Sequence, residues 1–398
     1  MNDLSEISRP IWQRPPRAVY IHIPFCRRRC GYCNFTLVAG RNDLITPYLD
    51  AMSVEARNYE LPCAVDTIFI GGGTPSQVRG DDWTRLTKWL HGQFPLIEAG
   101  EWSVEVNPED ADDTYLQQLR DSGVTRVSMG VQSFCDAKLK TLEREHTGLQ
   151  AIDAVRRAVA IFESVGVDLI FAAPGETPDQ WRRDLQLAIS VGTQHISTYG
   201  LTFERGAAFW SRRDLLALDE EIELAMYQAS IELLTKEGFE HYEVSNFARL
   251  GYRCRHNECY WTGDTYHALG AGASRHLLGR RETNHRSTTQ YLRLLKEGKS
   301  PVHEVDESSD RDKALETLIF GLRRLDGVNR NWFRQNTGFE IEEVTGGLIA
   351  EYCDEGWLAD DGRVLQLTSK GLVVSDGLWT GMLKVAGTLR VPLAQVVK

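Results

Sequence analysis

Short apolar runs, rich in β-branched residues, alternate with amphipathic stretches at helical spacing along the first half of the chain. The runs predict strands at Ala18–Ile23, Asp66–Ile70, Trp102–Val106, Thr125–Met129, Val167–Phe171 and His195–Leu201. The stretches between them predict helices at Pro47–Glu60, Trp83–Leu90, Thr114–Arg120, Ala151–Ser164 and Pro178–Ser190. A strand–helix order of this kind predicts a parallel sheet with helices packed outside it.

The number of strand–helix units limits the architecture. Six units are fewer than the eight of a closed (β/α)8 barrel. We therefore expect an α/β fold whose main domain, residues 18–240, is an open, partial (β/α)6 barrel that follows an N-terminal arm at residues 1–17. Because the carboxyl ends of parallel strands share one face, where ligands bind, the segments after these strands predict a single site.

The second half of the chain has a different pattern. Asp219–Gly238 predicts a long helix, and Phe239–His276 is irregular and rich in Gly, His, Cys and aromatic residues. We assign residues 241–307 to a segment that completes the site. In residues 308–383, two helical stretches precede an Asp361-Gly362 hairpin turn, which predicts a small winged-helix-like domain. Residues 384–398 receive no assignment.

Composition and charge restrict the class of protein. The 398 residues are 42% hydrophobic and 25% charged, as in ordinary globular proteins. A net charge of −11 and few basic residues on the expected reading helix argue against nucleic acid as a partner. No apolar run approaches the roughly 20 residues of a membrane span, and no signal peptide is recognisable, so we expect a cytoplasmic protein.

Three of the eight cysteines form a compact motif directly after the first expected strand. Cys26, Cys30 and Cys33 have the spacing C-x3-C-x2-C, and tight spacings in a reducing compartment favour metal over disulfides. Three thiolates can each ligate one iron of a [4Fe–4S] cube and leave the fourth iron open. The alternatives are a zinc site with His22 as fourth ligand, or unrelated thiols. The position at the end of the first strand favours the cluster.

Four motifs together resemble those of a known superfamily. They are Tyr20–Phe35 around the cysteines, Phe69–Ser76 (FIGGGTPS), Gly130–Phe134 (GVQSF) and His256–Trp261 (HNECYW). On these residues the chain resembles the radical S-adenosylmethionine (SAM) superfamily. More narrowly, it is similar to the group that contains the oxygen-independent coproporphyrinogen III dehydrogenases (HemN-like) and the haem chaperones (HemW). The resemblance extends from about Val19 to Leu378 and implies that SAM chelates the open iron.

The resemblance also implies a set of residues that contact SAM. They are Tyr20, Tyr32, Gly72, Gly73, Thr74, Glu105, Gln132, Arg144 and Asp168. Taken without the resemblance, the glycines are compatible with a simple tight turn, and Arg144 is typical of a solvated helix end. Glu105 is the most informative of them, because a carboxylate within an apolar strand is costly to bury unless it is paired.

The His256-Asn257-x-x-Tyr260-Trp261 motif resembles a mark of the haem-chaperone branch. A neutral imidazole suits haem iron, and aromatic side chains suit a flat porphyrin. The resemblance therefore implies that His256, Tyr260 and Trp261 bind haem. By itself, the histidine is equally compatible with a surface residue or with a hydrogen-bonded residue of the core. The remaining cysteines are expected to be plain thiols: Cys63, Cys135, Cys254, Cys259 and Cys353.

Two departures from the dehydrogenase pattern favour the chaperone branch. Phe35 stands where the dehydrogenases have a further cysteine, and only 25 residues precede Cys26, where they carry a longer arm. We expect a protein that binds the cluster, SAM and haem, and delivers haem to a respiratory acceptor, at the membrane surface or elsewhere. An external electron donor is implied. Coproporphyrinogen III decarboxylation and radical SAM methyl transfer remain the alternatives, and the pattern assigns no catalytic residue.

Overall fold

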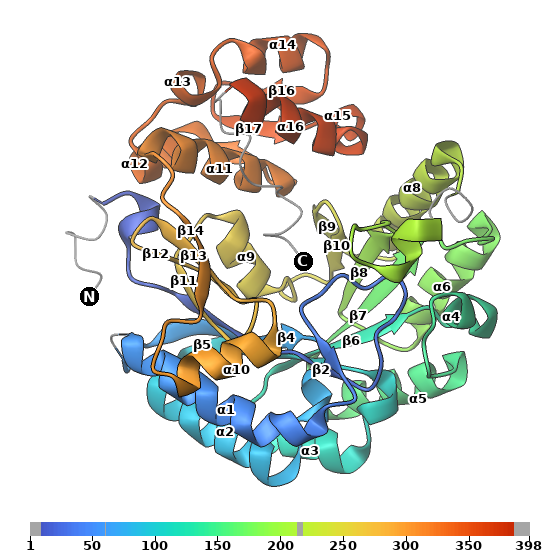
Figure 1. The fold of residues 1–398 in the computed structure, drawn as a ribbon. Coiled ribbons are helices and arrows are strands. Elements are labelled where there is room, and N and C mark those ends of the chain that lie inside the picture. The colour runs from blue at the N-terminus through green and yellow to red at the C-terminus, as the bar shows by residue number, and fades with distance from the viewer. Residues whose placement is uncertain (1–8, 60, 213–217, 386–398) are drawn as a thin grey trace.

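The computed structural model describes residues 9–59, 61–212 and 218–385, and a twelve-stranded sheet forms its centre (Figure 1). The strand order is β14-β13-β12-β11-β1-β4-β5-β6-β7-β8-β10-β9. The strands from β11 to β8 in this order run parallel, and antiparallel strands extend the sheet at both edges. Within the described residues β14 and β9 are free edges, so the sheet is an open barrel.

All six strands expected from the apolar runs are present. Their bounds are β1 Ala18–Ile23, β4 Val65–Gly72, β5 Leu96–Val106, β6 Arg126–Gln132, β7 Ser164–Phe171 and β8 His195–Gly200. Helices cover the outer face of the sheet: α1 Ile45–Glu55, α2 Gly80–Gln93, α3 Asp113–Asp121, α4 Asp136–Thr141, α5 Gly148–Ile161, α6 Pro178–Ser190 and α8 Glu220–Lys236. The expected α/β fold with a partial barrel is therefore confirmed.

The two faces of the parallel strands differ in polarity. Outward residues such as Ile68, Val104 and Val127 are fully buried against the helices. The alternate positions are mostly polar, and Glu105, Arg126 and Asp168 interact with one another inside the barrel. Because side chains of a strand point alternately to its two faces, each strand places apolar side chains against the outer helices and polar side chains inside the barrel.

The segment expected to be irregular contains regular elements. They are β9 Glu240–Glu243, β10 Asn246–Ala248, α9 Arg255–Trp261, β11 Tyr266–Leu269, β12 Ser274–Leu277, β13 Arg280–Asn284, α10 Thr288–Lys296 and β14 Val302–Asp306. β11 pairs with β1 and adds a parallel strand to the six expected ones. Its four residues follow Gly263 and precede Gly270, so the run is too short to stand out as a strand in the sequence.

The C-terminal region has the expected winged-helix-like arrangement. Its elements are α11 Asp310–Arg323, β15 Val328–Asn329, α12 Arg330–Thr337, α13 Ile341–Thr345, α14 Leu348–Asp354, β16 Leu358–Asp360, β17 Val364–Leu367, α15 Ser369–Val373 and α16 Ser375–Val385. The strands form a small antiparallel sheet in the order β15-β17-β16. Trp12, from the N-terminal arm, is buried in the core of this domain. Most of the unassigned tail, residues 386–398, lies outside the described residues, as do residues 1–8 of the arm.

No helix of the described residues combines the length and the apolar character that crossing a bilayer requires.

A buried carboxyl group on α1 connects the strands that follow residue 260 to the barrel. Glu55, 1% exposed, accepts hydrogen bonds from the Gly270 N–H at 3.0 Å, Asn284 Nδ2 at 2.6 Å and the Tyr291 hydroxyl at 2.6 Å. Arg275 lies 3.7 Å away. One side chain thus joins the first helix to elements more than 200 residues later.

We predict that Glu55→Ala strongly destabilises the fold. The substitution leaves the Gly270 N–H and the Tyr291 hydroxyl buried without their acceptor, which costs about 3–5 kcal/mol of unfolding free energy. Asp50→Ala on the same helix is the control, because Asp50 pairs with Arg85 at the surface and contributes about 1 kcal/mol or less. Urea denaturation of both variants measures the difference, and equal effects would contradict the assigned role of Glu55.

Candidate functional site

The three motif cysteines lie on one loop at the carboxyl end of β1. Cys26 ends β2 (Phe25–Cys26), which pairs with β3 (Val38–Ala39), and the loop between these two strands carries the other two cysteines. Cys26 is 8% exposed, whereas Cys30 and Cys33 are half-buried. The Cys33 N–H donates to the Cys30 carbonyl at 3.1 Å, which turns the chain between them. The loop therefore presents three thiols on a short, folded segment.

Two arginines fix the outer part of this cysteine loop. The Arg29 guanidinium donates to the carbonyls of Cys33, Phe35 and Leu37, each at 3.2 Å. Arg286, which follows β13, donates to the Asn34 carbonyl at 2.6 Å and to Thr36 Oγ1 at 3.1 Å. Backbone carbonyls that a short loop cannot satisfy by itself are thus bound by cationic side chains.

The donor set fits an iron–sulfur cube better than a single zinc ion. Among the described residues, no three His, Cys, Asp or Glu side chains are gathered closely enough to hold one ion. His22, the conceivable fourth zinc ligand, has both ring nitrogens engaged, with the Tyr20 hydroxyl at 3.0 Å and the Thr36 carbonyl at 2.8 Å. A cube needs one sulfur at each of three separate irons, which three spaced thiols on a loop can provide.

Burial raises the pKa of the Cys26 thiol to about 11 and also raises that of Cys33. Thiolates are the ligands of iron, so binding must supply positive charge to offset this burial. The Arg144 guanidinium supplies part of it, because its Nη1 lies 3.8 Å from Cys30 Sγ and it lowers the pKa of both other thiols. The three thiols are therefore suited to a bound group that carries positive charge.

The glycine turn after β4 lies against the cysteine loop. Gly72 has φ +119°, and a Cβ at this position would lie 2.6 Å from the His22 ring. A Cβ on Gly73 would lie 2.9 Å from the Phe25 carbonyl and 3.1 Å from Cys26 Sγ. Only glycine permits this approach. Thr74 Oγ1 then lies 3.2 Å from Cys26 Sγ, so the turn and the cysteine loop form one surface.

Two carboxyl groups lie beside this turn inside the barrel. Glu105 accepts a hydrogen bond from the Gly72 N–H at 2.9 Å. Burial, together with the nearby Asp168 carboxyl, raises the pKa of Glu105 to about 8. Burial also raises the pKa of Asp168, against the opposing effect of Ser197 and the Arg126 guanidinium. Carboxyl groups with raised pKa values in a polar cleft are typical of a binding or catalytic site.

Arg144 joins the cysteine loop to the ends of β5 and β6. It donates to Asn107 Oδ1 at 2.9 Å and to the Gly130 carbonyl at 3.0 Å, and it interacts with Tyr32. Gln132, at the end of β6, has a φ of 64° and lies where the strand register shifts. Most of the predicted SAM-contacting residues therefore come together with the cysteines at the carboxyl ends of the strands, whereas Tyr20 and Asp168 lie within β1 and β7.

The predicted haem-binding residues lie elsewhere. His256, on α9, is 1% exposed; its Nδ1 lies 2.8 Å from Thr67 Oγ1 and its Nε2 lies 2.8 Å from the Tyr260 hydroxyl. Burial lowers the pKa of His256 to about 3. Trp261 is 4% exposed and packs toward Phe320 of α11. Figure 1 shows α9 between the sheet and the C-terminal domain. Both ring nitrogens of His256 are hydrogen-bonded, so iron binding at His256 would require breaking one of these bonds.

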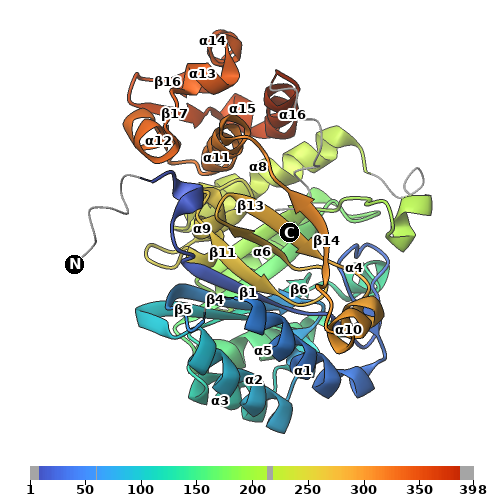
Figure 2. The same cartoon turned by 60° about the vertical axis from the view of Figure 1, so that its left-hand side comes forward.

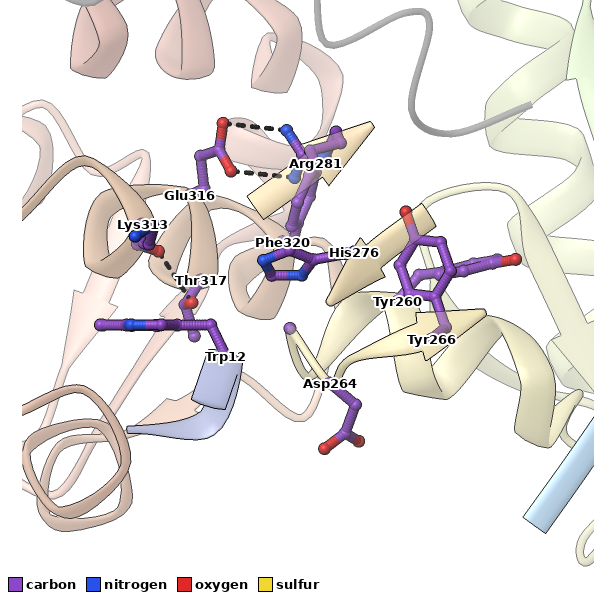
Figure 3. Close-up of a pocket in the computed structure, with 11 residues that line it drawn as sticks. Trp12, Tyr260, Asp264, Tyr266, His276, Arg281, Lys313, Glu316, Thr317 and Phe320 are labelled. Atoms are coloured by element: carbon purple, nitrogen blue, oxygen red, sulfur yellow. Dashed lines mark hydrogen bonds and ion pairs between the residues drawn. The ribbon is translucent and has the colours of Figure 1, made fainter. Parts of the chain in front are cut away.

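A column of rings separates this motif from the cysteine loop. The ring centroids of Tyr20 and Phe69 lie 6.2 Å apart, and those of Phe69 and His256 lie 5.1 Å apart. Tyr260 continues the column to Tyr266, at 4.7 Å. Figure 3 shows the two tyrosines beside a cavity of about 20 Å³ at the C-terminal domain, where Arg281 pairs with Glu316. A cavity of this volume accommodates little more than a water molecule.

Three residues of the site were missed by the sequence analysis. Asn107 holds Arg144, and Arg126, 3% exposed, faces Asp168 inside the barrel. Tyr199, on β8, is 42% exposed and also faces Asp168. Arg126 and Tyr199 occupy the inward positions of their strands. The alternation of polar and apolar residues within each strand was the signal that would have found these two.

Comparisons with known proteins agree with this geometry. The family model described as the radical SAM superfamily matches residues 20–188, and that of the HemN C-terminal domain matches residues 309–374. The heme chaperone HemW of Lactococcus lactis is 35% identical over 368 residues, which cover 92% of this chain and 96% of that protein. The heme chaperone HemW of Escherichia coli is 31% identical over 371 residues, which cover 92% of this chain and 97% of that protein.

Among solved structures, the chain is similar to coproporphyrinogen III oxidase (HemN) from Escherichia coli, which is a radical SAM enzyme. The TM-score is 0.83 at 22% identity, and the match covers 95% of this chain and 92% of that one. The similarity shows that the two proteins share a fold, including the open barrel and the C-terminal domain.

We predict a pH dependence of stability from Glu105. A carboxyl group with a folded pKa of about 8 binds its proton more tightly than in the unfolded chain. Its contribution is therefore complete at low pH and is lost as pH rises toward 8, by about 1.4 kcal/mol per pH unit. Glu105→Gln cannot ionise and lacks this loss. Urea unfolding of both proteins between pH 5 and 9 should show diverging curves, and parallel curves would contradict the predicted ionisation.

Proposed function

Since the chain belongs to the radical SAM superfamily and, within it, to the HemW family, we propose that it is a haem chaperone that delivers haem to a respiratory haem protein. The observation that carries this proposal is the arrangement of Cys26, Cys30 and Cys33 against the Gly72-Gly73 turn, in an α/β barrel shared with this family. The free thiols and their spacing are consistent with a reducing cytoplasm, which is the location we propose.

We assign the three motif cysteines to a [4Fe–4S] cluster and the neighbouring strand ends to SAM. The SAM-contacting set is Tyr20, Tyr32, Gly72, Gly73, Thr74, Glu105, Gln132, Arg144 and Asp168. When bound, the reduced cluster supplies the electron that cleaves SAM. The chain itself contributes orientation: Glu105 suits an ammonium group, and the guanidinium of Arg144 suits a carboxylate.

The oxygen-independent coproporphyrinogen III dehydrogenases remain the second candidate because of the shared fold. Phe35 argues against this candidate, since it stands two residues after Cys33, where the dehydrogenase pattern has a further cysteine. Its side chain is 39% exposed at the surface of the cysteine loop. Radical SAM methyl transfer uses the same kind of scaffold, but no residue of the site favours it.

We predict that Cys30→Ser abolishes the cluster. A hydroxyl is a poor substitute for a thiolate on iron, and only three protein ligands are proposed. After anaerobic reconstitution with iron and sulfide, the variant should lose the brown chromophore and most bound iron. Cys353→Ser, in the C-terminal domain, is the control and should retain both. A full cluster in Cys30→Ser would overturn the assignment.

Two parallel assays on the reconstituted protein distinguish chaperone from dehydrogenase. One titrates haem and follows its Soret band; the other supplies coproporphyrinogen III, SAM and a reductant. Saturable haem binding without a decarboxylated product supports the chaperone, and product formation overturns it.

We further propose that the electron donor is an acidic protein that docks beside the cysteine loop. Arg28 and Arg212 are about half exposed there and share a single carboxylate, Glu143, at 3.8 and 3.6 Å. The bonds of Arg29 and Arg286 described above are to carbonyl and hydroxyl groups, which leave their charges unneutralised. Arg28, Arg29, Arg212 and Arg286 thus form a local basic patch on a chain whose net charge is −11. Such a patch attracts an acidic partner protein.

We predict that the double substitution Arg28→Gln/Arg212→Gln slows cluster reduction by a reduced, acidic flavodoxin by about tenfold at low ionic strength. The salt dependence of the rate should become shallower, because fewer charges steer the encounter. Reduction by dithionite is the internal control and should be unchanged. Arg120→Gln/Arg156→Gln makes the same change in net charge on the outer helices. Equal slowing in both double variants would exclude a specific docking surface.

A further inference from the structure

The accessibility of the histidines restricts where a haem iron could be held. At least one ring nitrogen is hydrogen-bonded in seven of the ten histidines: His22, His91, His146, His195, His241, His256 and His276. His267 is 5% exposed and packs against the rings of Tyr59 and Phe94. The two that remain are His285 and His303.

These two histidines form a contact pair at the edge of the sheet. Their ring centroids lie 4.3 Å apart, with an angle of 34° between the rings. His303 is exposed on β14, and His285 is half-buried directly after β13. In the described part of the chain, neither side chain has a hydrogen-bond or ion-pair partner. Figure 2 shows β14 at the margin of the sheet, next to α10. An imidazole here can reach iron without any rearrangement of the core.

The histidine pair is connected to the cysteine loop. Arg286, the residue after His285, binds the Asn34 carbonyl and Thr36 Oγ1 of that loop. The His285 carbonyl accepts a hydrogen bond from the Gly272 N–H at 3.0 Å, and a Cβ on Gly272 would lie 2.3 Å from Thr36 Oγ1. The cysteine loop and the backbone next to the histidine pair are therefore in direct contact.

The surroundings suit an iron porphyrin better than a bare metal ion. Two imidazoles give too few ligands for tetrahedral zinc, whereas a porphyrin supplies four nitrogens and needs one axial imidazole. Val305 lies on the same face of β14 as His303 and is 47% exposed, so it offers an apolar contact. The exposed Arg286 guanidinium, bound to oxygens without charge, suits a propionate.

We propose that His303 ligates haem iron at this outer edge of the sheet, with His285 packed against its ring. The inference rests on the proposed chaperone function and names the site of its cargo. A haem held at a free edge strand is accessible to an acceptor protein, which a haem enclosed around His256 is not. The link through Arg286 places the cargo where the state of the cysteine loop can affect its release.

Haem titration of the full-length reconstituted protein tests the site. His303→Ala should weaken haem binding by about tenfold or more and remove the Soret and EPR signatures of imidazole ligation. His285→Ala should weaken haem binding less than His303→Ala does. The double variant should weaken it at least as much as His303→Ala. His91→Ala, at an exposed histidine of α2, is the matched control, and His256→Ala tests the motif histidine as the alternative ligand. Circular dichroism verifies that each variant folds.

The outcomes separate this inference from the function it rests on. Wild-type binding that is unchanged in the His285/His303 double variant, or lost only in His256→Ala, overturns the site but leaves the chaperone proposal in place. A wild-type protein that binds no haem overturns both. Tight Zn²⁺ binding that needs both histidines, with haem binding unchanged in the double variant, would identify the pair as a metal-ion site instead.

Discussion

The structure depends on offsetting the charges that are buried inside a barrel whose inner face is polar. Arg126 is almost fully buried, and the Glu101 and Asp168 carboxyl groups offset its charge electrostatically. Glu101 in turn binds the backbone N–H groups of Arg255 and His256 at 3.1 and 3.2 Å. Because a buried carboxylate without hydrogen-bond partners is costly, these bonds hold α9 against β5.

Much of the barrel could be predicted because its outward positions follow simple rules. Short apolar runs rich in β-branched residues marked β1 and β4 to β8, and the Thr177-Pro178 start of α6 has a capping box that defines its first residue. β11 and the edge strands were missed because they are short, and β11 in addition pairs with β1, which is far away in the chain. Their place depends on contacts such as that of Glu55 with Asn284, which no local pattern reveals.

The residues of the site also differ in whether the sequence alone could identify them. The cysteine spacing and the Gly71–Gly73 turn carry their chemistry locally, and the structure brings them together as expected. Asn107 was not identified, because it is a common polar residue whose importance comes from its hydrogen bond with the Arg144 guanidinium. His256 shows the converse limit. Its motif is distinctive in sequence, yet the structure gives it two hydrogen bonds in the core, which is also what a packing role requires.

The stacked rings of Tyr20 and Phe69 have a consequence for what can enter the barrel. A Cβ on Gly71 would lie 2.8 Å from the Phe69 ring, so this ring fills the space directly behind the glycine turn. A molecule bound at the turn would therefore meet aromatic carbon on its inner side rather than further open space.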